Sequence, residues 1–386
     1  MSDKIDPARV SLGDIFRYFL RLGALGFGGP VALVGYMERD LVERDRWLTK
    51  EEFSEGVALA AALPGPLAAQ VAMWIGYLRH GFWGCSVASL GMIGPSFLMV
   101  LALSVLYLQY EEARWMRALF YGIGPVVSAL IADSCYRLSK RYLPDGKMIR
   151  VAVVCLVVTL LARAELAVLF LLGGGVGVLL YARPFRRGKH RGSPPGTFSL
   201  LGPYLALSFS VLPRERLFQL MIFFFKAGLF TFGSGLAVAP FINQGLVIER
   251  GWLSERQFLD TVAVGMITPG PVVIMATLAG YLIRGFWGSV VAALGVFSPV
   301  CLTVLFLAPF LIRHREHPVV TAFAKGATAA AVGVISGAGI IIGRGVIVDW
   351  VTGVIAGFGF LLLLFWRIEG LLLVAGAGIV GLLIYP

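Results

Sequence analysis

The chain of 386 residues is poor in charge, since Asp, Glu, Lys and Arg make up 14% of it, against about 25% in a typical soluble domain. Its four cysteines include no CxxC pair and its four histidines no HExxH motif, and neither a P-loop nor an Asp-rich metal motif occurs. These absences argue against a disulfide framework and a thiolate metal site. We therefore predict no catalytic residue, no cofactor and no metal site.

Apolar residues are abundant instead. The hydrophobic fraction is 58% and the mean hydropathy is +0.84. A membrane-spanning helix needs roughly 20 apolar residues, and apolar runs recur at 84–109, 148–162, 165–182, 288–312 and 351–366. The net charge of +11 fits the cytoplasmic loops of a membrane protein, where Lys and Arg gather, better than nucleic-acid binding. We predict an all-α polytopic membrane protein whose partner is the lipid bilayer.

The two halves of the chain repeat each other. The segment Asp45–Pro66 aligns with Arg250–Pro271 at an offset of 205, and both end in Pro-Gly-Pro. Upstream, GFGGP at Gly26–Pro30 aligns with TFGSG at Thr231–Gly235. Downstream, GYLRHGFWG aligns with GYLIRGFWG at an offset of 204. We predict an N-terminal repeat over 1–185, a basic linker with an inverting membrane segment over 186–213, and a C-terminal repeat over 214–386.

The repeat also preserves local signals for helix starts and stops. Thr49 with Glu52, and Ser254 with Gln257, form capping boxes at equivalent places. Each helix that follows is predicted to end at the Pro-Gly-Pro break, because proline lacks an N–H and clashes with the preceding turn. The GFGGP and TFGSG segments are predicted to be breaks of the same kind. Each half should therefore open with two broken helices and continue with four unbroken ones.

The distribution of basic residues orients the two halves. Basic loops at 140–150 and 183–191 are predicted to be cytoplasmic. The basic loop at 313–315 corresponds to an outside loop in the first half, yet its charge places it inside. The repeats should therefore have inverted topology, with about 13 membrane segments arranged as six, one and six. In transporters of that kind the binding site lies near the midplane, where broken helices meet.

Taken together, the GFGGP motif, the Trp-to-Phe run before each break, the Pro-Gly-Pro break, the GFWG loop and their duplication resemble the chromate ion transporter family, two-domain type. The resemblance covers nearly the whole chain. It implies efflux of chromate across the bacterial plasma membrane, with sulfate as a related oxyanion and a homodimer as one assembly to test. The second half departs from the pattern, because Gly233-Ser234-Gly235 replaces Gly-Gly-Pro. If these loops bind substrate, the two halves bind it unequally.

A tetrahedral dianion needs N–H donors and positive potential, and a helix N-terminus offers both. We predict that the helices that follow the four breaks point their N-termini at the anion. The alternative is that Gly and Pro only permit close packing or kinks. The predicted substrate contacts are Arg21, Phe27, Gly28, Gly29, Pro30, Pro64, Gly65, Pro66, Lys226, Gly233, Ser234, Gly235, Pro269, Gly270 and Pro271.

Two ionisable positions keep their sign in both repeats. Arg21 aligns with Lys226, and Glu55 with Asp260. Charges inside membrane segments cost roughly 2.5–3.5 kcal/mol on insertion scales. The cations are predicted to face the anion and the acids to exchange protons for coupling. Alternatively, each cation forms a structural ion pair with the acid of its own repeat.

Three functions fit these patterns to different degrees. We favour a secondary active exporter of chromate or a sulfate-related oxyanion. An anion channel that uses helix dipoles without alternating access is the first alternative. An integral-membrane enzyme is the second, but no metal or nucleophile cluster is visible in the apolar segments.

Overall fold

A computed structural model describes residues 10–27, 29–63, 65–162, 166–181, 215–229, 231–233, 235–307, 318–366, 368 and 370–385. Three of the predicted substrate contacts, Gly28, Pro64 and Ser234, lie outside these residues, and so does the predicted linker 186–213. The regular structure of the described chain is helical, apart from one pair of two-residue strands.

The elements of the first repeat are α1 (Leu12–Leu25), α2 (Gly29–Met37), η2 (Glu38–Arg44), α3 (Lys50–Ala62), β1 (Gly65–Pro66), α4 (Leu67–Tyr110), α5 (Arg114–Tyr142), α6 (Gly146–Ala162) and α7 (Leu166–Tyr181). Those of the second are α9 (Arg216–Leu229), β2 (Phe232–Gly233), η4 (Gly235–Val238), α10 (Ala239–Ile242), η5 (Asn243–Ile248), α11 (Glu255–Ile267), η6 (Val272–Ile274), α12 (Met275–Leu302), η7 (Thr303–Leu307), α14 (Pro318–Val346), α15 (Trp350–Leu361), η8 (Leu362–Trp366) and α16 (Gly370–Ile384). The η elements are short 3₁₀- or π-helices.

The structure repeats as the sequence does. The helices α5 and α14 each have 29 residues and begin 204 positions apart. The pairs α6 and α15, and α7 and α16, begin at the same offset. Even irregular backbone is shared, since Arg46 and Gly251 both have positive φ, at 51° and 59°. The internal duplication is therefore a duplication of structure.

Capping residues explain where many helices start. The two predicted capping boxes, at Thr49 and Ser254, are both present. Two further capping boxes were not predicted from the sequence: Ser11 caps α1 and Asp349 caps α15. Each supplies side-chain acceptors to backbone N–H groups that the first turn of a helix leaves unpaired.

Equivalent aspartates mark the starts of α6 and α15. Asp349 accepts from the N–H of Thr352 and from the hydroxyl of Tyr121, and these bonds hold the pKa of Asp349 below its usual range. Asp145, 204 positions earlier, accepts from the Tyr181 hydroxyl at 2.6 Å, which lowers the pKa of its carboxyl as well. In each case one side-chain hydrogen bond ties a helix start to another helix.

A sharp turn divides α4 into two helical arms. The chain stays helical to Arg79, reverses at His80 and Gly81, and continues to Tyr110. Arg284 and Gly285 reverse the chain in the same way within α12. The two arms touch at the Gly76–Gly84 and Gly280–Gly288 pairs. An added Cβ on any of these glycines would meet the backbone of its partner glycine in the other arm. Each α4 and α12 is thus a tight helical hairpin.

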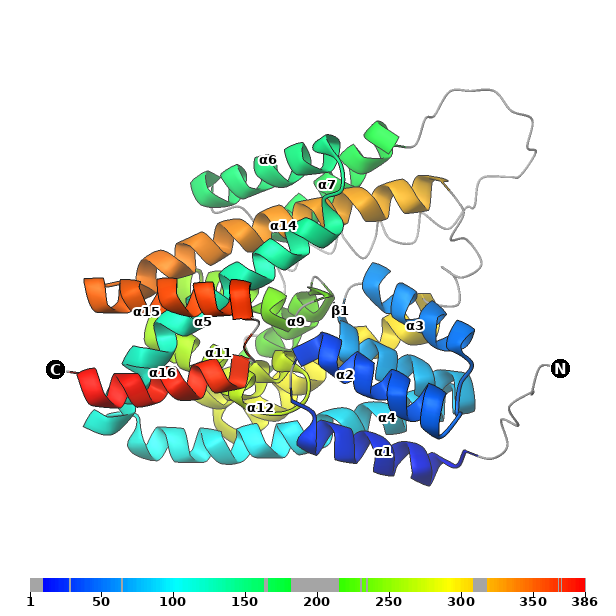
Figure 1. The fold of residues 1–386 in the computed structure, drawn as a ribbon, viewed down its shortest axis with the longest axis horizontal. Coiled ribbons are helices and arrows are strands. Elements are labelled where there is room, and N and C mark those ends of the chain that lie inside the picture. Colours follow the sequence, from blue (N-terminus) through cyan, green and yellow to red (C-terminus); the bar gives the residue numbers. More distant parts are fainter. Residues whose placement is uncertain are drawn as a thin grey trace.

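The two repeats are intertwined. The helix α5 of the first repeat packs against α15 and α16 of the second, while α14 of the second packs against α6 and α7 of the first (Figure 1). Small residues allow these crossings, as where an added Cβ on Gly122 or Gly326 would strike the backbone of α16 or α7. Each repeat therefore completes the other, and neither forms a separate globule.

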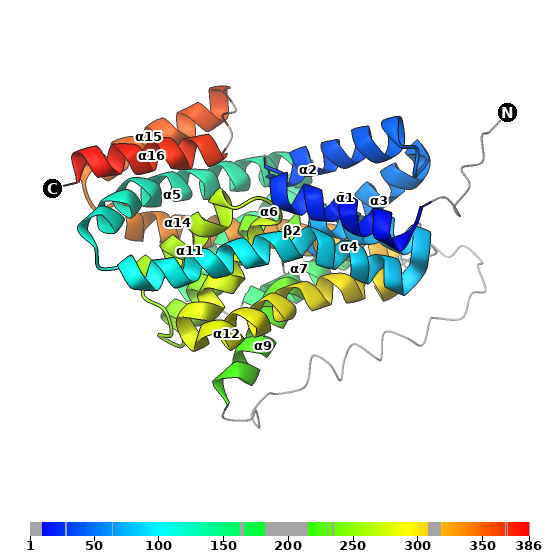
Figure 2. The same ribbon diagram turned by 90° about the horizontal axis from the view of Figure 1, so that it is seen from below.

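Equivalent helices run in opposite directions along the long axis. In Figure 1, α5 runs from left to right and α14 from right to left, and α16 ends at the left, where the C-terminus is marked. The second arm of each hairpin, over 82–110 in α4 and 286–302 in α12, is its outer arm. Figure 2 shows the two outer arms side by side and in opposite directions. The equivalent described helices are therefore antiparallel, which is the arrangement expected of inverted repeats. Which end faces the cytoplasm, and the total of 13 segments, stay predictions.

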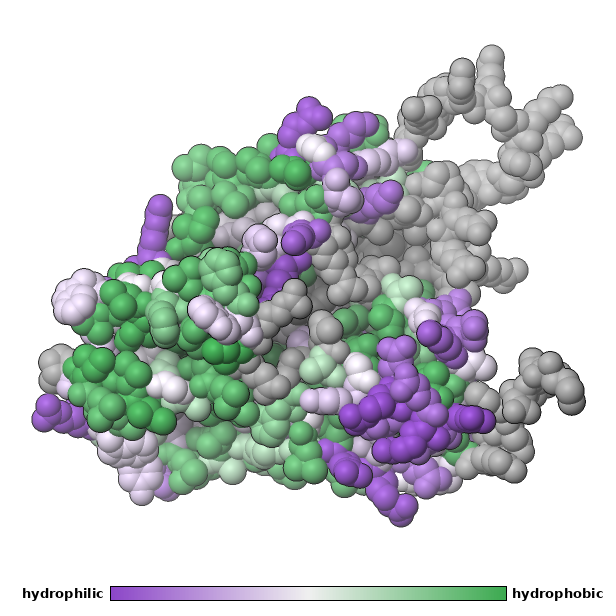
Figure 3. Space-filling model, in the orientation of Figure 1, coloured by the Kyte–Doolittle hydropathy of each residue, from purple (hydrophilic) through white to green (hydrophobic). Residues whose placement is uncertain are grey.

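The surface is that of a membrane protein. Four described helices are long and apolar enough to cross a membrane, namely those over 67–110, 114–140, 272–306 and 325–346. Large apolar side chains such as Leu161, Leu179 and Leu383 are exposed. Figure 3 shows apolar surface over α15, α16 and the lower part of the molecule, with hydrophilic residues gathered at the right, over α1 to α3. The chain is an all-α polytopic membrane protein.

Candidate functional site

The first Pro-Gly-Pro break of the chain meets the glycine-rich break of the other repeat. Gly65 and Pro66 form β1, which pairs in parallel with Phe232 and Gly233 of β2. The N–H of Gly65 donates to the carbonyl oxygen of Thr231, whose side chain is fully buried. The pairing joins two interrupted helices, and the paired residues are 167 positions apart in the chain.

The same contact occurs a second time with the repeats exchanged. The N–H of Gly270 donates to the carbonyl oxygen of Gly26 at 3.0 Å. Gly270 is equivalent to Gly65, and Gly26 to Thr231, at the offset of 205. The two hydrogen bonds are therefore related by a pseudo-twofold axis, and the region that contains them is the crossing of the two repeats.

The two breaks of the second repeat also contact each other. An ideal Cβ on Gly235 would lie 2.9 Å from the Cβ of Val272 and 3.1 Å from the backbone N of Val273. The two breaks of the second repeat thus touch each other as well as those of the first. The structure brings all four breaks together, as predicted, and the described residues from Gly65 to Gly76 around them are buried. Burial by protein is what irregular backbone at membrane depth requires.

The two Pro-Gly-Pro glycines have backbone angles that suit glycine. Gly65 has φ +139° and Gly270 has φ +91°, a region that other residues adopt only with strain. A Cβ on Gly65 would lie 2.6 Å from Nε2 of Gln70, whereas one on Gly270 would collide with Oγ of Ser96. That hydroxyl reaches two carbonyl oxygens, Pro269 at 2.8 Å and Gly23 at 3.3 Å. Ser96 thus joins the two repeats at the crossing.

Helix starts at the breaks differ between the repeats. In the first, α2 begins at Gly29 and α4 at Leu67. In the second, 3₁₀ turns begin at Gly235 and Val272 where helices were expected. The β-branched run at 272–274 explains one of them, since such residues fit a helix less well. In the described structure no side chain caps the starts that follow Pro66 and Pro271.

The remaining predicted contacts surround these starts. Phe27 and Pro30 are half-buried, while Pro66, Pro269 and Pro271 are buried. Gly29 is the first residue of α2, and Gly233 belongs to β2. None of the described proline and glycine contacts is therefore far from the crossing.

The two cations occupy exposed faces. Arg21 lies on the exposed side of α1 and Lys226 on that of α9. Among the described residues, no ion pair joins Arg21 to Glu55 or Lys226 to Asp260. The structural pairing considered as an alternative is thus not found. Contact with a substrate stays a prediction for both.

The two acids differ in burial. Glu55 is half-buried in α3, whereas Asp260 in α11 is 1% exposed. Asp260 accepts a hydrogen bond of 2.5 Å from the hydroxyl of Tyr107, which lies in the outer arm of α4. Its other partner is Arg256, with Nε at 3.8 Å. A buried carboxylate held between the repeats in this way was not visible in the sequence, which carries no local signal linking 107 to 260.

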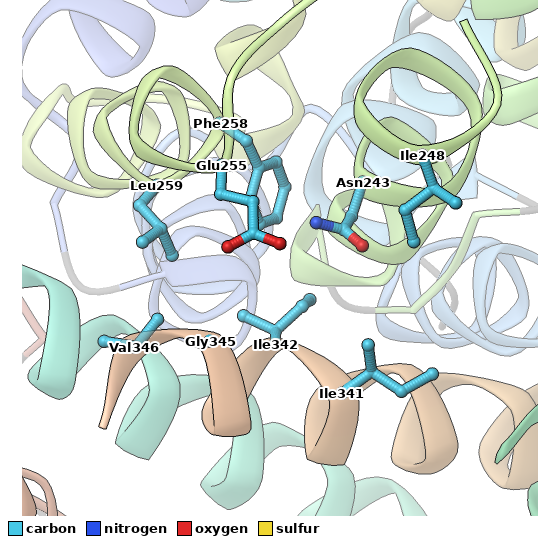
Figure 4. A pocket seen from close by; sticks show the side chains of 9 residues that line it. All are labelled: Asn243, Ile248, Glu255, Phe258, Leu259, Ile341, Ile342, Gly345 and Val346. Atoms are coloured by element: carbon cyan, nitrogen blue, oxygen red, sulfur yellow. The ribbon is translucent and has the colours of Figure 1, made fainter. Parts of the chain in front are cut away.

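A small pocket lies away from the crossing, between η5, α11 and α14 (Figure 4). Its volume is about 40 Å³, and Asn243 and Glu255 face each other across it over an apolar floor that includes Ile341 and Ile342. The carboxylate of Glu255 would repel an oxyanion. The pocket is therefore a poor candidate for the anion site.

The interrupted helices, their burial and the reciprocal pairing of antiparallel repeats define a class: an all-α polytopic membrane transporter. Comparison with known sequences gives the family. The family model described as chromate transporter matches residues 13–178 and 218–382. The chain belongs to the chromate transporter family, in its two-repeat form, and is a multi-pass protein of the bacterial plasma membrane.

Relatives match over most of their length. A chromate transport protein of Cupriavidus metallidurans is 43% identical over 381 residues, which are 97% of this chain and 94% of that protein. A probable chromate transport protein of Synechococcus elongatus is 43% identical, over 88% of this chain and 86% of its own. A chromate transport protein of Pseudomonas aeruginosa is 31% identical, over 98% and 94%. No solved structure matches the chain.

Proposed function

We propose that this protein is a secondary active transporter that exports chromate across the plasma membrane, with sulfate as a related substrate. Membership of the family and the names of its relatives support chromate as the cargo. The observation that carries the mechanism is the reciprocal crossing, in which Gly65 and Gly270 each donate to the opposite repeat. The predicted boundaries at 185 and 213 and a homodimeric assembly belong to the same proposal.

The crossing suggests how the anion is held. In the arrangement described, the N–H groups of Gly65 and Gly270 are already bonded to carbonyl oxygens. These donors reach an anion only when the crossing opens. The oxyanion would then replace the Thr231 and Gly26 carbonyls as acceptor, and the uncapped starts after Pro66 and Pro271 would supply further N–H groups and positive potential.

Asp260 is proposed as the coupling residue. A buried carboxylate costs free energy unless it is bonded or protonated, and its bond from Tyr107 crosses between the repeats. Relative motion of the repeats would break that bond and favour proton uptake. Glu55, the equivalent residue, is proposed as its more exposed counterpart. Arg21 and Lys226 are proposed to attract the anion from exposed positions near the breaks.

Tyr107→Phe tests this coupling. The substitution removes the hydroxyl and leaves the ring, so the buried carboxylate loses a bond worth roughly 1.5–3 kcal/mol. The pH profile of proton-driven uptake should then shift, while chromate exchange at equal pH on both sides continues. Tyr110→Phe, on the same helix with an exposed ring, is the control. An unchanged pH profile in Tyr107→Phe would remove Asp260 from the coupling step.

Everted membrane vesicles test transport itself. Radiolabelled chromate and sulfate are supplied with and without a proton gradient, and uptake is compared with vesicles that lack the protein. Secondary active export predicts accumulation above the external concentration only when the gradient is present. Equilibration without accumulation would favour the anion channel, and conversion of chromate without movement would favour an enzyme.

A further inference from the structure

Two cysteines from different repeats meet in the membrane domain. Sγ of Cys85, in the outer arm of α4, lies 3.3 Å from Sγ of Cys301, near the end of α12. The other described cysteines, Cys135 and Cys155, form no such pair. We propose that Cys85 and Cys301 are a redox modification site that forms a reversible disulfide and ties the two repeats together.

The geometry requires little movement. A disulfide has sulfurs about 2.0 Å apart, so small rotations of the two side chains bring these thiols within bonding distance. They are held near each other by the packing of α4 against α12 (Figure 2). Because this interface joins the repeats, a covalent bond there would fix their relative position.

The difference in exposure assigns a role to each thiol. Cys85 is fully buried, whereas Cys301 is partly exposed. A peroxide would oxidise the Cys301 thiol to a sulfenic acid and leave as water or alcohol. The Cys85 thiol would then attack that sulfur, form the S–S bond and release a second molecule of water. Two thiols are oxidised, one peroxide is reduced, and a partner thiol beside the first is the arrangement of redox-sensing cysteines.

The internal repeat supplies a control. The residue equivalent to Cys85 is Ser289, and the residue equivalent to Cys301 is Phe97, so the thiol pair occurs on one side of the pseudo-twofold axis. Ser289 is fully buried and donates to the carbonyl oxygen of Thr277 at 3.0 Å. The fold therefore accepts serine in this environment, and Cys85→Ser is a conservative test.

The chemical test counts thiols in the full-length protein with Cys135→Ala and Cys155→Ala. After treatment with hydrogen peroxide and denaturation, a maleimide of large mass should label no cysteine, against two before treatment and two again after dithiothreitol. In Cys85→Ser, the sulfenic acid on Cys301 should persist and react with dimedone. Two labelled thiols after oxidation, or a bond between two chains on a non-reducing gel, would overturn the proposal. Should the double alanine variant not fold, mass spectrometry of the Cys85–Cys301 peptide pair in the unmodified protein decides.

The effect on transport rests on the proposed function and is measured separately. Oxidised protein should take up chromate at least tenfold more slowly, with recovery on reduction, while Cys85→Ser keeps its rate under the same peroxide. A disulfide that forms without slowing uptake would overturn the locking role. Thiol counting needs no transport, so failure of the chromate assay in reduced protein would instead count against the proposed function.

Discussion

The two Pro-Gly-Pro glycines should respond differently to alanine. Each has positive φ, and a residue forced into such a region costs about 1–3 kcal/mol. Beyond this shared strain, the Cβ of Gly65→Ala meets the far end of the buried Gln70 side chain, whose length lets it shift at a smaller cost. The Cβ of Gly270→Ala meets Oγ of Ser96, a short side chain already bonded to the Pro269 carbonyl.

The contact at Ser96 adds a second cost to Gly270→Ala. Displacing its hydroxyl removes a hydrogen bond worth about 1 kcal/mol. We therefore expect Gly65→Ala to destabilise by about 1–3 kcal/mol and Gly270→Ala by about 2–4 kcal/mol. Both should also weaken chromate binding, because the loops can no longer approach the ion closely. Thermal unfolding and chromate binding are measured on the same size-exclusion fraction.

Second-site changes make this reasoning refutable. Ser96→Ala should relieve part of the cost of Gly270→Ala and leave Gly65→Ala unaffected. Gln70→Ala should relieve Gly65→Ala only. Such coupling between neighbours appears as non-additivity in a double-mutant cycle. Additive effects in both cycles would show that the described contacts do not control these loops. Wild-type affinity in folded Gly65→Ala would remove this loop from the substrate site.

Further predictions concern charges and topology. Arg21→Ala and Lys226→Ala should each weaken chromate binding without loss of expression, and Arg21→Lys should retain more function because the charge remains; normal transport by Arg21→Gln would exclude a direct electrostatic role. Asp260→Asn should abolish proton-driven accumulation yet permit chromate exchange, and accumulation at the wild-type level would exclude it as the coupling group. Tags near Gln109 and near Arg315 should report opposite sides of the membrane; the same side for both would refute the inverted topology.

The duplicated sequence predicts much of this fold, and the reason is physical. Capping boxes and proline breaks act over a few residues, so Thr49, Ser254 and the Pro-Gly-Pro segments fix helix ends locally. Arg79 and His80 interrupt the apolar run and mark the turn in α4, but they do not show how tightly its two arms fold back on each other. Glycine follows at position 81. Its positive φ of 53° shows why glycine stands there.

Contacts between distant segments were beyond sequence reasoning. The breaks could be expected to meet, since buried irregular backbone needs partners, but nothing near Gly26 indicates that Gly270 donates to it. Tyr107 and Ser96 likewise occur in an apolar helix, where the sequence alone suggests only that a lone polar residue packs against its neighbours. Their partners become apparent only when α4 lies against the second repeat.

The most direct test of the account is whether chromate acts at the crossing of the repeats. Hydrogen–deuterium exchange of the lipid-embedded protein, followed by mass spectrometry, reports on peptides that contain Gly65 and Gly270, with chloride as the control anion. We expect chromate to slow exchange in both peptides together, because one ion contacts equivalent N–H groups of both repeats. Unchanged exchange in both peptides at saturating chromate, or protection confined to a distant segment, would contradict it.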